Sequence, residues 1–325
     1  MNSMRASPLV YLIDASIYIF RAHFSPYVES YNESGKELSA LYGFAGFLLQ
    51  FMRRVKPDHI AVAHDESLFC GFRHKLCRNY KSNRELPDEN LQMQLTGCGD
   101  FCSIIGLPSF SSKVYEADDI IGTIAARVRN EKECDVNIVS CDKDLVQLLK
   151  KESDCLWDYN GNRKRFRSHI IDEFGVRPEQ FPDYLGLIGD SVDCITGVPG
   201  IGPVKAKKLL NQFSSLESIY LNLDKVKTSQ LRGAVRLTEL LGKHRDLAEL
   251  SKVLATIVCD VKDSEEPFSH VVLENLVPQP VNEAVLCEFF NTYKFGPRDQ
   301  ERLMTLAQRV NTPVSYTHLT LPTKA

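Results

Sequence analysis

The chain has 325 residues, with 39 basic and 42 acidic side chains, a formal net charge of −3 and 43% hydrophobic residues. No run approaches the roughly 18 consecutive apolar residues of a membrane-spanning helix, so the composition excludes a spanning protein and predicts one large globular domain or two. Near-neutral charge means that a nucleic-acid partner would need a local basic patch.

The N-terminal residues and the cysteines predict the cellular compartment of the protein. The N-terminal text MNSMRASP leads directly into LVYLID and lacks the regions of a secretory signal. The ten cysteines are scattered, without a CxxC pair or a Cys/His cluster at zinc-ligand spacing. We therefore expect reduced, mostly buried thiols in a cytoplasmic protein without a membrane partner.

In chain order, three short apolar runs each end in an aspartate and predict buried strands of a parallel sheet: LVYLID (9–14), HIAVAHD (59–65) and VNIVSCD (136–142). Helical patterns over 39–54 and 116–130 separate them, which predicts an α/β fold with a mostly parallel central sheet. Asn160–Gly161, within 154–167, predicts a hairpin turn.

Near residue 175 the text changes to prolines, glycines, lysines and long helical stretches. We expect a first domain over 1–175, a mostly helical domain over 176–260, and a segment over 261–312 that packs back on the first domain. Residues 313–325 follow neither pattern, and we expect them to be a non-native tail.

Carboxylates dominate the predicted carboxyl edge of the sheet. Asp14, Asp65 and Asp142 each end a predicted strand, and ligands bind beyond such ends in parallel sheets. The remaining acidic candidates are Glu116, Asp118, Asp119, Asp144, Asp190 and Asp193. So many like charges need cations, and oxygen-only ligands suit Mg²⁺ or Mn²⁺ in phosphoryl chemistry. Each aspartate taken alone could instead be a turn residue or a helix cap.

Two segments of the chain are rich in basic residues. FRHKLCRNYKSNR (72–84) contains Arg73, Lys81 and Arg84 around Tyr80, a pattern for phosphate contacts and base stacking, or else a solvated helix face. GVPGIGPVKAKKLL (197–210) opens a lysine-bearing helix after a glycine turn, which favours contacts to a nucleic-acid backbone, or else is an ordinary tight turn. Its candidate DNA contacts are Gly200, Gly202, Lys205, Lys207 and Lys208.

Taken together, these motifs resemble the structure-specific 5′ nuclease family. Its members include the 5′ nuclease domain of bacterial DNA polymerase I, stand-alone bacterial 5′–3′ exonucleases and bacteriophage flap endonucleases. The matching text, in family order, is LIDAS, AHDES, FRHKLCRNYKSNRE, YEADDIIG, SCDKDLVQLL and GLIGDSVDCITGVPGIGPVKAKKLL, with a weaker match at FFNTYKFG. The resemblance implies a PIN-like nuclease domain, a helical arch around 66–100 and a helix–three-turn–helix DNA-binding domain.

The resemblance also implies a role for each candidate residue. Asp14, Asp65, Glu116, Asp118 and Asp119 would hold or surround a first metal, whereas Asp142, Asp144, Asp190 and Asp193 would complete that site and supply a second. Tyr80, Lys81 and Arg84 would contact the 5′ strand of DNA, and we expect Arg73, from the same basic segment, to bind DNA as well. The catalytic residues would be Lys81, Arg84, Asp142 and Asp14.

Two departures from the family pattern flank the glycine turn. Cys194 stands where the family has Asn, and Ile195–Thr196 replaces Leu-Pro. Both bear on the geometry of the turn and on the potassium ion that related enzymes hold there.

The sequence therefore predicts a monomeric, two-metal 5′–3′ exonuclease and flap endonuclease that acts on DNA flaps and on nicked, branched or RNA-primed duplexes. No polymerase region follows, so we expect the stand-alone type. The alternatives are a PIN-like ribonuclease, which leaves the glycine turn unexplained, and a non-catalytic branched-DNA-binding module, which would be expected to lack some of the acids. A toprim-type nuclease would need a glutamate where Asp14 and Asp65 stand.

Overall fold

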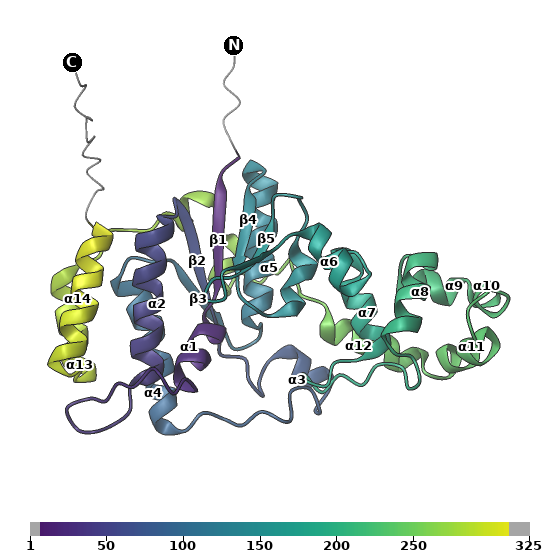
Figure 1. Cartoon of the computed structure of the whole chain (residues 1–325), viewed down its shortest axis with the longest axis horizontal. Coiled ribbons are helices and arrows are strands. Elements are labelled where there is room, and N and C mark those ends of the chain that lie inside the picture. The colour runs from purple at the N-terminus through teal and green to yellow at the C-terminus, as the bar shows by residue number, and fades with distance from the viewer. Residues whose placement is uncertain (1–6, 312–325) are drawn as a thin grey trace, which may run out of the picture.

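A six-stranded sheet forms the centre of the computed structural model, which describes residues 7–311 (Figure 1). The strands are β1 (Leu9–Asp14), β2 (His59–Asp65), β3 (Ser109–Ser112), β4 (Asp135–Val139), β5 (Cys155–Asp158) and β6 (Arg163–Arg165). Their order is β3-β2-β1-β4-β5-β6, and among these described strands only β6 runs antiparallel to its neighbour. The predicted α/β class with a mostly parallel sheet is confirmed.

The first two predicted strands are confirmed, and the third is shorter than expected. β4 ends at Val139 because the chain turns at the next residue, where Ser140 Oγ accepts a hydrogen bond from the Asp142 N–H at 3.0 Å. Asp142 then caps a 3₁₀ helix, η1 (Lys143–Leu148), by accepting the Asp144 N–H at 2.9 Å. This carboxylate thus lies just beyond the edge of the sheet.

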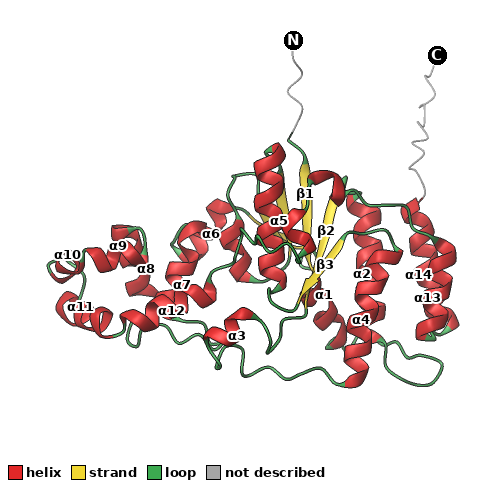
Figure 2. Ribbon diagram, turned by 180° about the vertical axis from the view of Figure 1, so that it is seen from behind, coloured by secondary structure: helices red, strands yellow, loops and turns green. Residues whose placement is uncertain are grey.

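Helices cover both faces of the sheet (Figure 2). On one face lie α1 (Ala15–His23), α2 (Ser39–Val55), α4 (Glu89–Ile104), α13 (Glu283–Tyr293) and α14 (Pro297–Asn311). They share a hydrophobic cluster with Ile13, Ile60 and Val139 of the sheet. Val10 and Ile138 face the opposite cluster, with α5 (Ala117–Lys132). The predicted helices over 39–54 and 116–130 are confirmed to within two residues.

A helical region extends from the α5 side of the sheet. It contains α6 (Arg167–Phe174), α7 (Phe181–Ile188), α8 (Pro203–Phe213), α9 (Leu216–Leu221), α10 (Leu223–Lys227), α11 (Ala234–Lys243), α12 (Arg245–Ala255) and the short 3₁₀ helix η2 (Pro178–Gln180). Two further 3₁₀ helices, η3 (Pro267–His270) and η4 (Leu273–Leu276), pack against α5. Ile120 of α5, Phe181 of α7 and Leu209 of α8 belong to one hydrophobic cluster. In Figure 1, α8–α11 lie at the end of the molecule opposite α13 and α14.

The structure tests some of the remaining predictions about chain organisation and leaves others untested. β5 and β6 form the expected hairpin around Asn160–Gly161. Between residues 66 and 100 the structure has α3 (Phe72–Leu76), a run of turns and most of α4, so the helical arch and the domain boundaries stay predictions. The tail predicted at 313–325 lies outside the described residues. None of the helices described between residues 7 and 311 is long and apolar enough to cross a membrane.

Candidate active site

Three aspartates meet at the carboxyl edge of the sheet. Asp14 ends β1, Asp65 ends β2 and Asp142 follows β4. Because β2, β1 and β4 are parallel neighbours, their carboxyl ends lie side by side. Asp14 is buried and accepts a hydrogen bond from Ser140 Oγ at 2.9 Å, and Asp65 accepts one from Ser67 Oγ at 2.9 Å. The fold thus gathers three predicted site residues that are far apart in the sequence.

Asp118, in the first turn of α5, joins this group. The pKa of Asp14 is raised to about 7, first by burial and then by the charge of Asp142. Burial raises the pKa of Asp118 well above its usual value, and the charges of Asp142 and Asp14 add to the effect. Within residues 7–311, no basic side chain forms an ion pair with Asp14, Asp65, Asp118 or Asp142. We call these four residues the unpaired carboxylates.

The unpaired carboxylates have the chemistry that a hard divalent cation requires. Their donors are all oxygens, and like charges held close together need positive charge to stay ionised. In the described part of the chain no three acidic, His or Cys side chains already converge closely enough to hold one ion.

The raised pKa of Asp14 predicts a pH dependence of stability. Since its pKa is about 7 in the folded chain and its usual value is 3.8, the folded state holds the proton more tightly. The stability that this proton contributes is present below the unfolded pKa and is lost as the pH rises through the folded pKa. Asp14→Asn, which imitates the protonated carboxyl, should exceed the parent in melting temperature at about pH 8 and lose most of that advantage at about pH 4.5. Thermal melts in EDTA measure this, and a difference independent of pH would contradict it.

Asp119 and Arg73 form a buried ion pair that departs from their predicted roles. The Arg73 guanidinium donates to both Asp119 oxygens, at 2.6 and 2.8 Å. Asp119 also accepts the N–H groups of Glu116 and Val258, so its two oxygens are fully engaged. Arg73 is 3% exposed and donates further to the Leu254 carbonyl at 2.9 Å. Neither Asp119 as a metal ligand nor Arg73 as a DNA contact fits this geometry, because every polar atom already has a protein partner.

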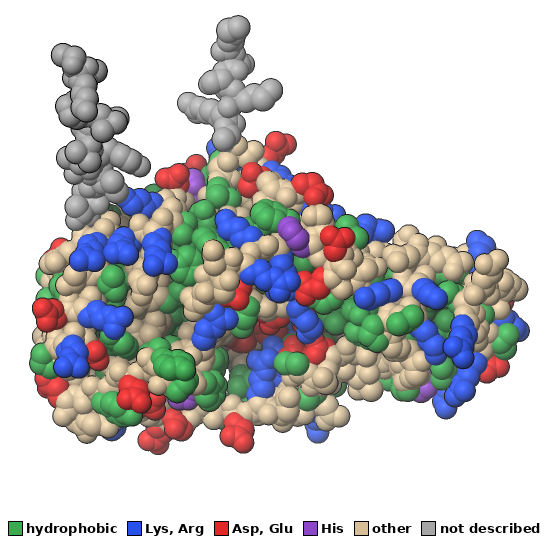
Figure 3. All heavy atoms as spheres, in the orientation of Figure 1, with side chains coloured by type: hydrophobic (Ala, Val, Ile, Leu, Met, Phe, Trp, Pro, Cys, Tyr) green, Lys and Arg blue, Asp and Glu red, His purple; other side chains and the backbone are tan. Residues whose placement is uncertain are grey.

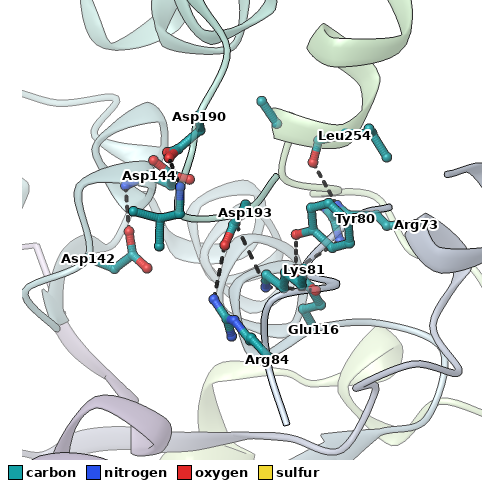
Figure 4. Close-up of polar contacts among 12 residues, drawn as sticks. Arg73, Tyr80, Lys81, Arg84, Glu116, Asp142, Asp144, Asp190, Asp193 and Leu254 are labelled. Carbon is teal, nitrogen blue, oxygen red and sulfur yellow. Dashed lines mark hydrogen bonds and ion pairs between the residues drawn. The ribbon is translucent and has the colours of Figure 1, made fainter. Parts of the chain in front are cut away.

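Tyr80 and Lys81 both donate hydrogen bonds to Glu116, which is the N-cap of α5. The Tyr80 hydroxyl donates to Glu116 Oε2 at 2.9 Å, and Lys81 Nζ donates to Glu116 Oε1 at 2.8 Å (Figure 4). Burial alone would raise the pKa of Glu116, but the charges of Lys81 and Arg73 outweigh it and lower the pKa. Tyr80 is 2% exposed, so the predicted stacking of its ring on a base does not fit. Lys81 is also buried, but it lies beside the carboxylates, as expected.

The remaining carboxylates, Asp144, Asp190 and Asp193, each have a protein cation. Arg84 Nη2 pairs with Asp193 Oδ1 at 2.9 Å, and Lys143 Nζ pairs with both Asp144 and Asp190. Figure 4 shows Asp142, Asp144 and Asp190 close together, with Arg84 pointing toward Asp193. The pKa of Asp144 is nevertheless raised to about 7, by burial and then by the charge of Asp142. These three residues, the paired carboxylates, are therefore partly neutralised by the protein itself.

The loop after α7 leads from the paired carboxylates to the glycine turn. Asp190 and Ile195 exchange backbone hydrogen bonds of 2.8 and 2.7 Å, which closes a tight loop around Cys194. Cys194 has a φ of +57°, a left-handed conformation that Asn adopts more readily than Cys. The turn itself needs glycine, since a Cβ on Gly197 would lie 2.2 Å from the Gly189 nitrogen.

The predicted lysine helix is α8, with Gly202 at its N-cap. Lys205 and Lys208 are exposed, whereas Lys207 is half-buried against Gly175. None of the three forms an ion pair in the described residues. Figure 3 shows Lys and Arg side chains over the α8–α11 end, on the same face as a central group of acidic and basic side chains. One face of the molecule thus presents acidic and basic side chains at its centre and this basic end.

Two residues of the site were missed by sequence reasoning. Ser140 holds Asp14 and the Asp142 backbone through its hydroxyl, and Lys143 bridges Asp144 and Asp190. Both belong to the text SCDKD, so their nearness to the aspartates was visible. The partners of their side chains could not be predicted from the sequence.

Comparisons with known proteins agree with this arrangement. Residues 9–178 match the model of the 5′–3′ exonuclease N-terminal resolvase-like domain, and residues 176–279 match that of the 5′–3′ exonuclease C-terminal SAM fold. A 5′–3′ exonuclease of Buchnera aphidicola is 32% identical over 262 residues, which cover 80% of this chain and 90% of that protein. DNA polymerase I of Caldicellulosiruptor bescii is 34% identical over 289 residues, but the chain spans only 32% of its length.

Solved structures share the fold. The T5 5′-exonuclease with bound divalent zinc ions aligns with a TM-score of 0.59 at 16% identity, covering 94% of this chain and all of that one (100%). The catalytic core of Rad2 in complex with a DNA substrate aligns with a TM-score of 0.60 at 13% identity, covering 94% of this chain and 92% of that one. By its matching domains and its relatives, the chain belongs to the 5′–3′ exonuclease family.

Proposed function

We propose that the chain is a metal-dependent 5′–3′ exonuclease and 5′-flap endonuclease that hydrolyses phosphodiesters at DNA ends and single-strand/double-strand junctions during replication or repair. The observation that carries this proposal is the group of Asp14, which is buried, and the half-buried Asp118 and Asp142; these three carboxylates form no ion pair in the described residues and lie near Lys81 and Arg84. Carboxylates short of positive charge suit metal ions, and nearby cations suit a phosphate.

Two divalent cations, Mg²⁺ or Mn²⁺, would bind at this edge. The unpaired carboxylates would hold one, and the paired carboxylates would hold the other. When bound, such cations lower the pKa of the attacking water and neutralise charge on the leaving oxygen. We also propose that backbone carbonyls of the glycine turn hold a potassium ion. Cys194, with its left-handed φ of +57°, lies in the loop just before this turn.

The chain's own side chains would position the substrate. Arg84 has a 41% exposed side chain and reaches Asp193, so it can turn to a phosphate without leaving the site. Lys81, held by Glu116, supplies fixed positive charge beside the scissile group. The α8 lysines would contact the duplex backbone, which carries no sequence information and so leaves shape as the recognised feature.

Two structural neighbours support these proposals, since one was solved with a DNA substrate and the other with divalent metal ions. We propose that the chain acts as a monomer on 5′ flaps and on nicked, branched or RNA-primed duplexes.

Cleavage assays test the proposed function directly. Labelled 5′-flap, nicked, blunt, RNA-primed and single-stranded RNA substrates would be incubated with Mg²⁺ and with EDTA. We expect metal-dependent cleavage near the flap junction and at 5′ ends. Preferential cleavage of single-stranded RNA would favour a PIN-like ribonuclease. Binding of flaps without cleavage in any divalent metal would favour a non-catalytic module.

The α8 lysines should determine duplex affinity. Replacing Lys205, Lys207 and Lys208 with alanine should weaken blunt and flap duplexes alike, and each lost phosphate contact should lower the slope of log affinity against log salt by about 0.9. Arg84→Ala is the contrasting variant, because it should leave duplex affinity nearly intact and reduce single-turnover cleavage. Fluorescence anisotropy over a salt series and quench-flow cleavage measure both. The opposite pattern would exchange the roles of the two sites.

A further inference from the structure

The nine candidate carboxylates differ in how much positive charge the protein gives them. Asp14, Asp65, Asp118 and Asp142 form no ion pair in the described residues. The other five pair with a lysine or an arginine: Glu116, Asp119, Asp144, Asp190 and Asp193. The two groups of proposed metal ligands therefore begin from different electrostatic states.

Lys143 is the cation of the Asp144–Asp190 pair. Its Nζ donates to Asp190 Oδ2 and lies 3.3 Å from Asp144 Oδ1. Asp144 Oδ1 is buried and accepts no hydrogen bond, so this ammonium group is its compensation in the described structure. One positive charge thus serves two carboxylates, which leaves the pair under-neutralised.

The Lys143 side chain is also far more exposed than that of Lys81, the other lysine of the site. Its side chain is 38% exposed, and both of its acidic partners belong to the proposed metal ligands. Lys81 is 7% exposed and is held by Glu116 at 2.8 Å with Asp193 at 4.0 Å. A divalent cation coordinated by Asp144 and Asp190 would bring two positive charges to the oxygens that Lys143 contacts, and like charges at that distance repel strongly. The divalent cation and the Lys143 ammonium group therefore cannot both contact the same carboxylate oxygens.

We propose that Lys143 is the resident counter-ion of Asp144 and Asp190, and that its ammonium group leaves these carboxylates when a divalent cation binds there. The inference rests on the proposed function, which assigns the two residues to the second cation. It implies that cations bind in sequence. The unpaired carboxylates bind the first without displacing any protein cation, and the second must replace Lys143.

Calcium titration of the metal-free, full-length protein without DNA tests this by isothermal calorimetry. We expect two binding phases in the parent, and in Lys143→Gln we expect the weaker phase to tighten by at least about tenfold while the stronger phase changes little. Lys150→Gln is the matched control, since it removes an exposed lysine from the same segment and the same net charge. Lys143→Arg keeps the charge and should leave the weaker phase weak.

Stability gives a second, independent measurement. In EDTA, Lys143→Gln leaves Asp144 and Asp190 uncompensated, so its melting temperature should fall below that of the parent and recover with Ca²⁺ more than the parent does. Circular dichroism checks that the variant is folded at the titration temperature.

The outcomes are distinguishable. Two calcium phases with the same affinities in the parent and in Lys143→Gln would overturn the role of Lys143 and leave the two-cation proposal standing. One calcium in the parent and two in Lys143→Gln would also overturn it, because Lys143 would then replace the second cation permanently. One calcium in both, unaffected by Asp190→Asn, would overturn the two-cation function and this inference together.

Discussion

Asp142→Asn is expected to reduce cleavage of a 5′ flap by more than the roughly 10–100-fold that loss of a hydrogen-bond partner of a metal ligand costs. Asp142 follows β4 at the sheet edge, and its charge raises the pKa of Asp14, Asp118 and Asp144. Its charge thus acts on members of both the unpaired and the paired carboxylates. Asparagine keeps the oxygen that caps η1 through the Asp144 N–H, so the local backbone should persist.

The same substitution should raise stability in EDTA while it removes activity. Because the substitution removes one negative charge from the unpaired carboxylates, the ionised forms of Asp14 and Asp118 become less unfavourable. Urea denaturation in EDTA and single-turnover cleavage in Mg²⁺ measure the two effects, and their opposite signs exclude unfolding as the cause. Asp172→Asn, an exposed acid of α6 outside the site, is the control and should cleave like the parent. Near-parental cleavage by Asp142→Asn at saturating Mg²⁺ would remove this residue from the site.

The carboxylate edge was predictable because it depends on few choices. An apolar run that ends in aspartate predicts both a strand and the end at which its carboxylate lies, and parallel neighbours bring such ends together whatever the loops do. Asp14, Asp65 and Asp142 follow from this alone. The strand order places them side by side.

The partner of Asp119 was not predictable in the same way, although part of its geometry was. In EADD, Glu116 and Asp119 have the spacing of a capping box, and the Asp119 side chain does turn back to the Glu116 N–H at 3.0 Å. The cation of Asp119, Arg73, lies 46 residues earlier, and no local pattern specifies such a pairing.

The basic segment shows the limit of reading charge from sequence. The position of Tyr80 between basic residues predicted an exposed ring. In the structure its hydroxyl donates a hydrogen bond to Glu116, and the ring is buried. Lys143 shows the converse, since a lysine between two aspartates was read only as part of an acidic motif. Which acid meets which base depends on the distance between elements after folding, and the chain's net charge of −3 does not determine it.

Arg73→Met is expected to destabilise the chain by about 3–5 kcal/mol, the usual cost of removing one partner of a buried ion pair. Asp119 is 0% exposed, so its charge would be left without a cation or access to water. The change also removes donors to the Leu254 and Thr256 carbonyls, at 2.9 and 2.7 Å, which connect α3 to the end of α12. One side chain therefore joins the start of the basic segment, the start of α5 and the helical region.

A double-mutant cycle separates the ion pair from the rest of this contact. Arg73→Met/Asp119→Leu removes both charges, so it should be less destabilised than the sum of the single variants in urea denaturation. Arg84→Ala breaks a partly exposed pair and, discounted for solvent screening, should cost less than about 1 kcal/mol. Should Arg73→Met keep its stability and lose affinity for duplex DNA, Arg73 would be a phosphate contact after all. The burial of its guanidinium against Asp119 argues for the structural result, because four of its five N–H groups already donate to two carboxylate oxygens and two carbonyls. The nitrogen that carries the fifth, Nη1, lies 3.5 Å from Glu116 Oε2.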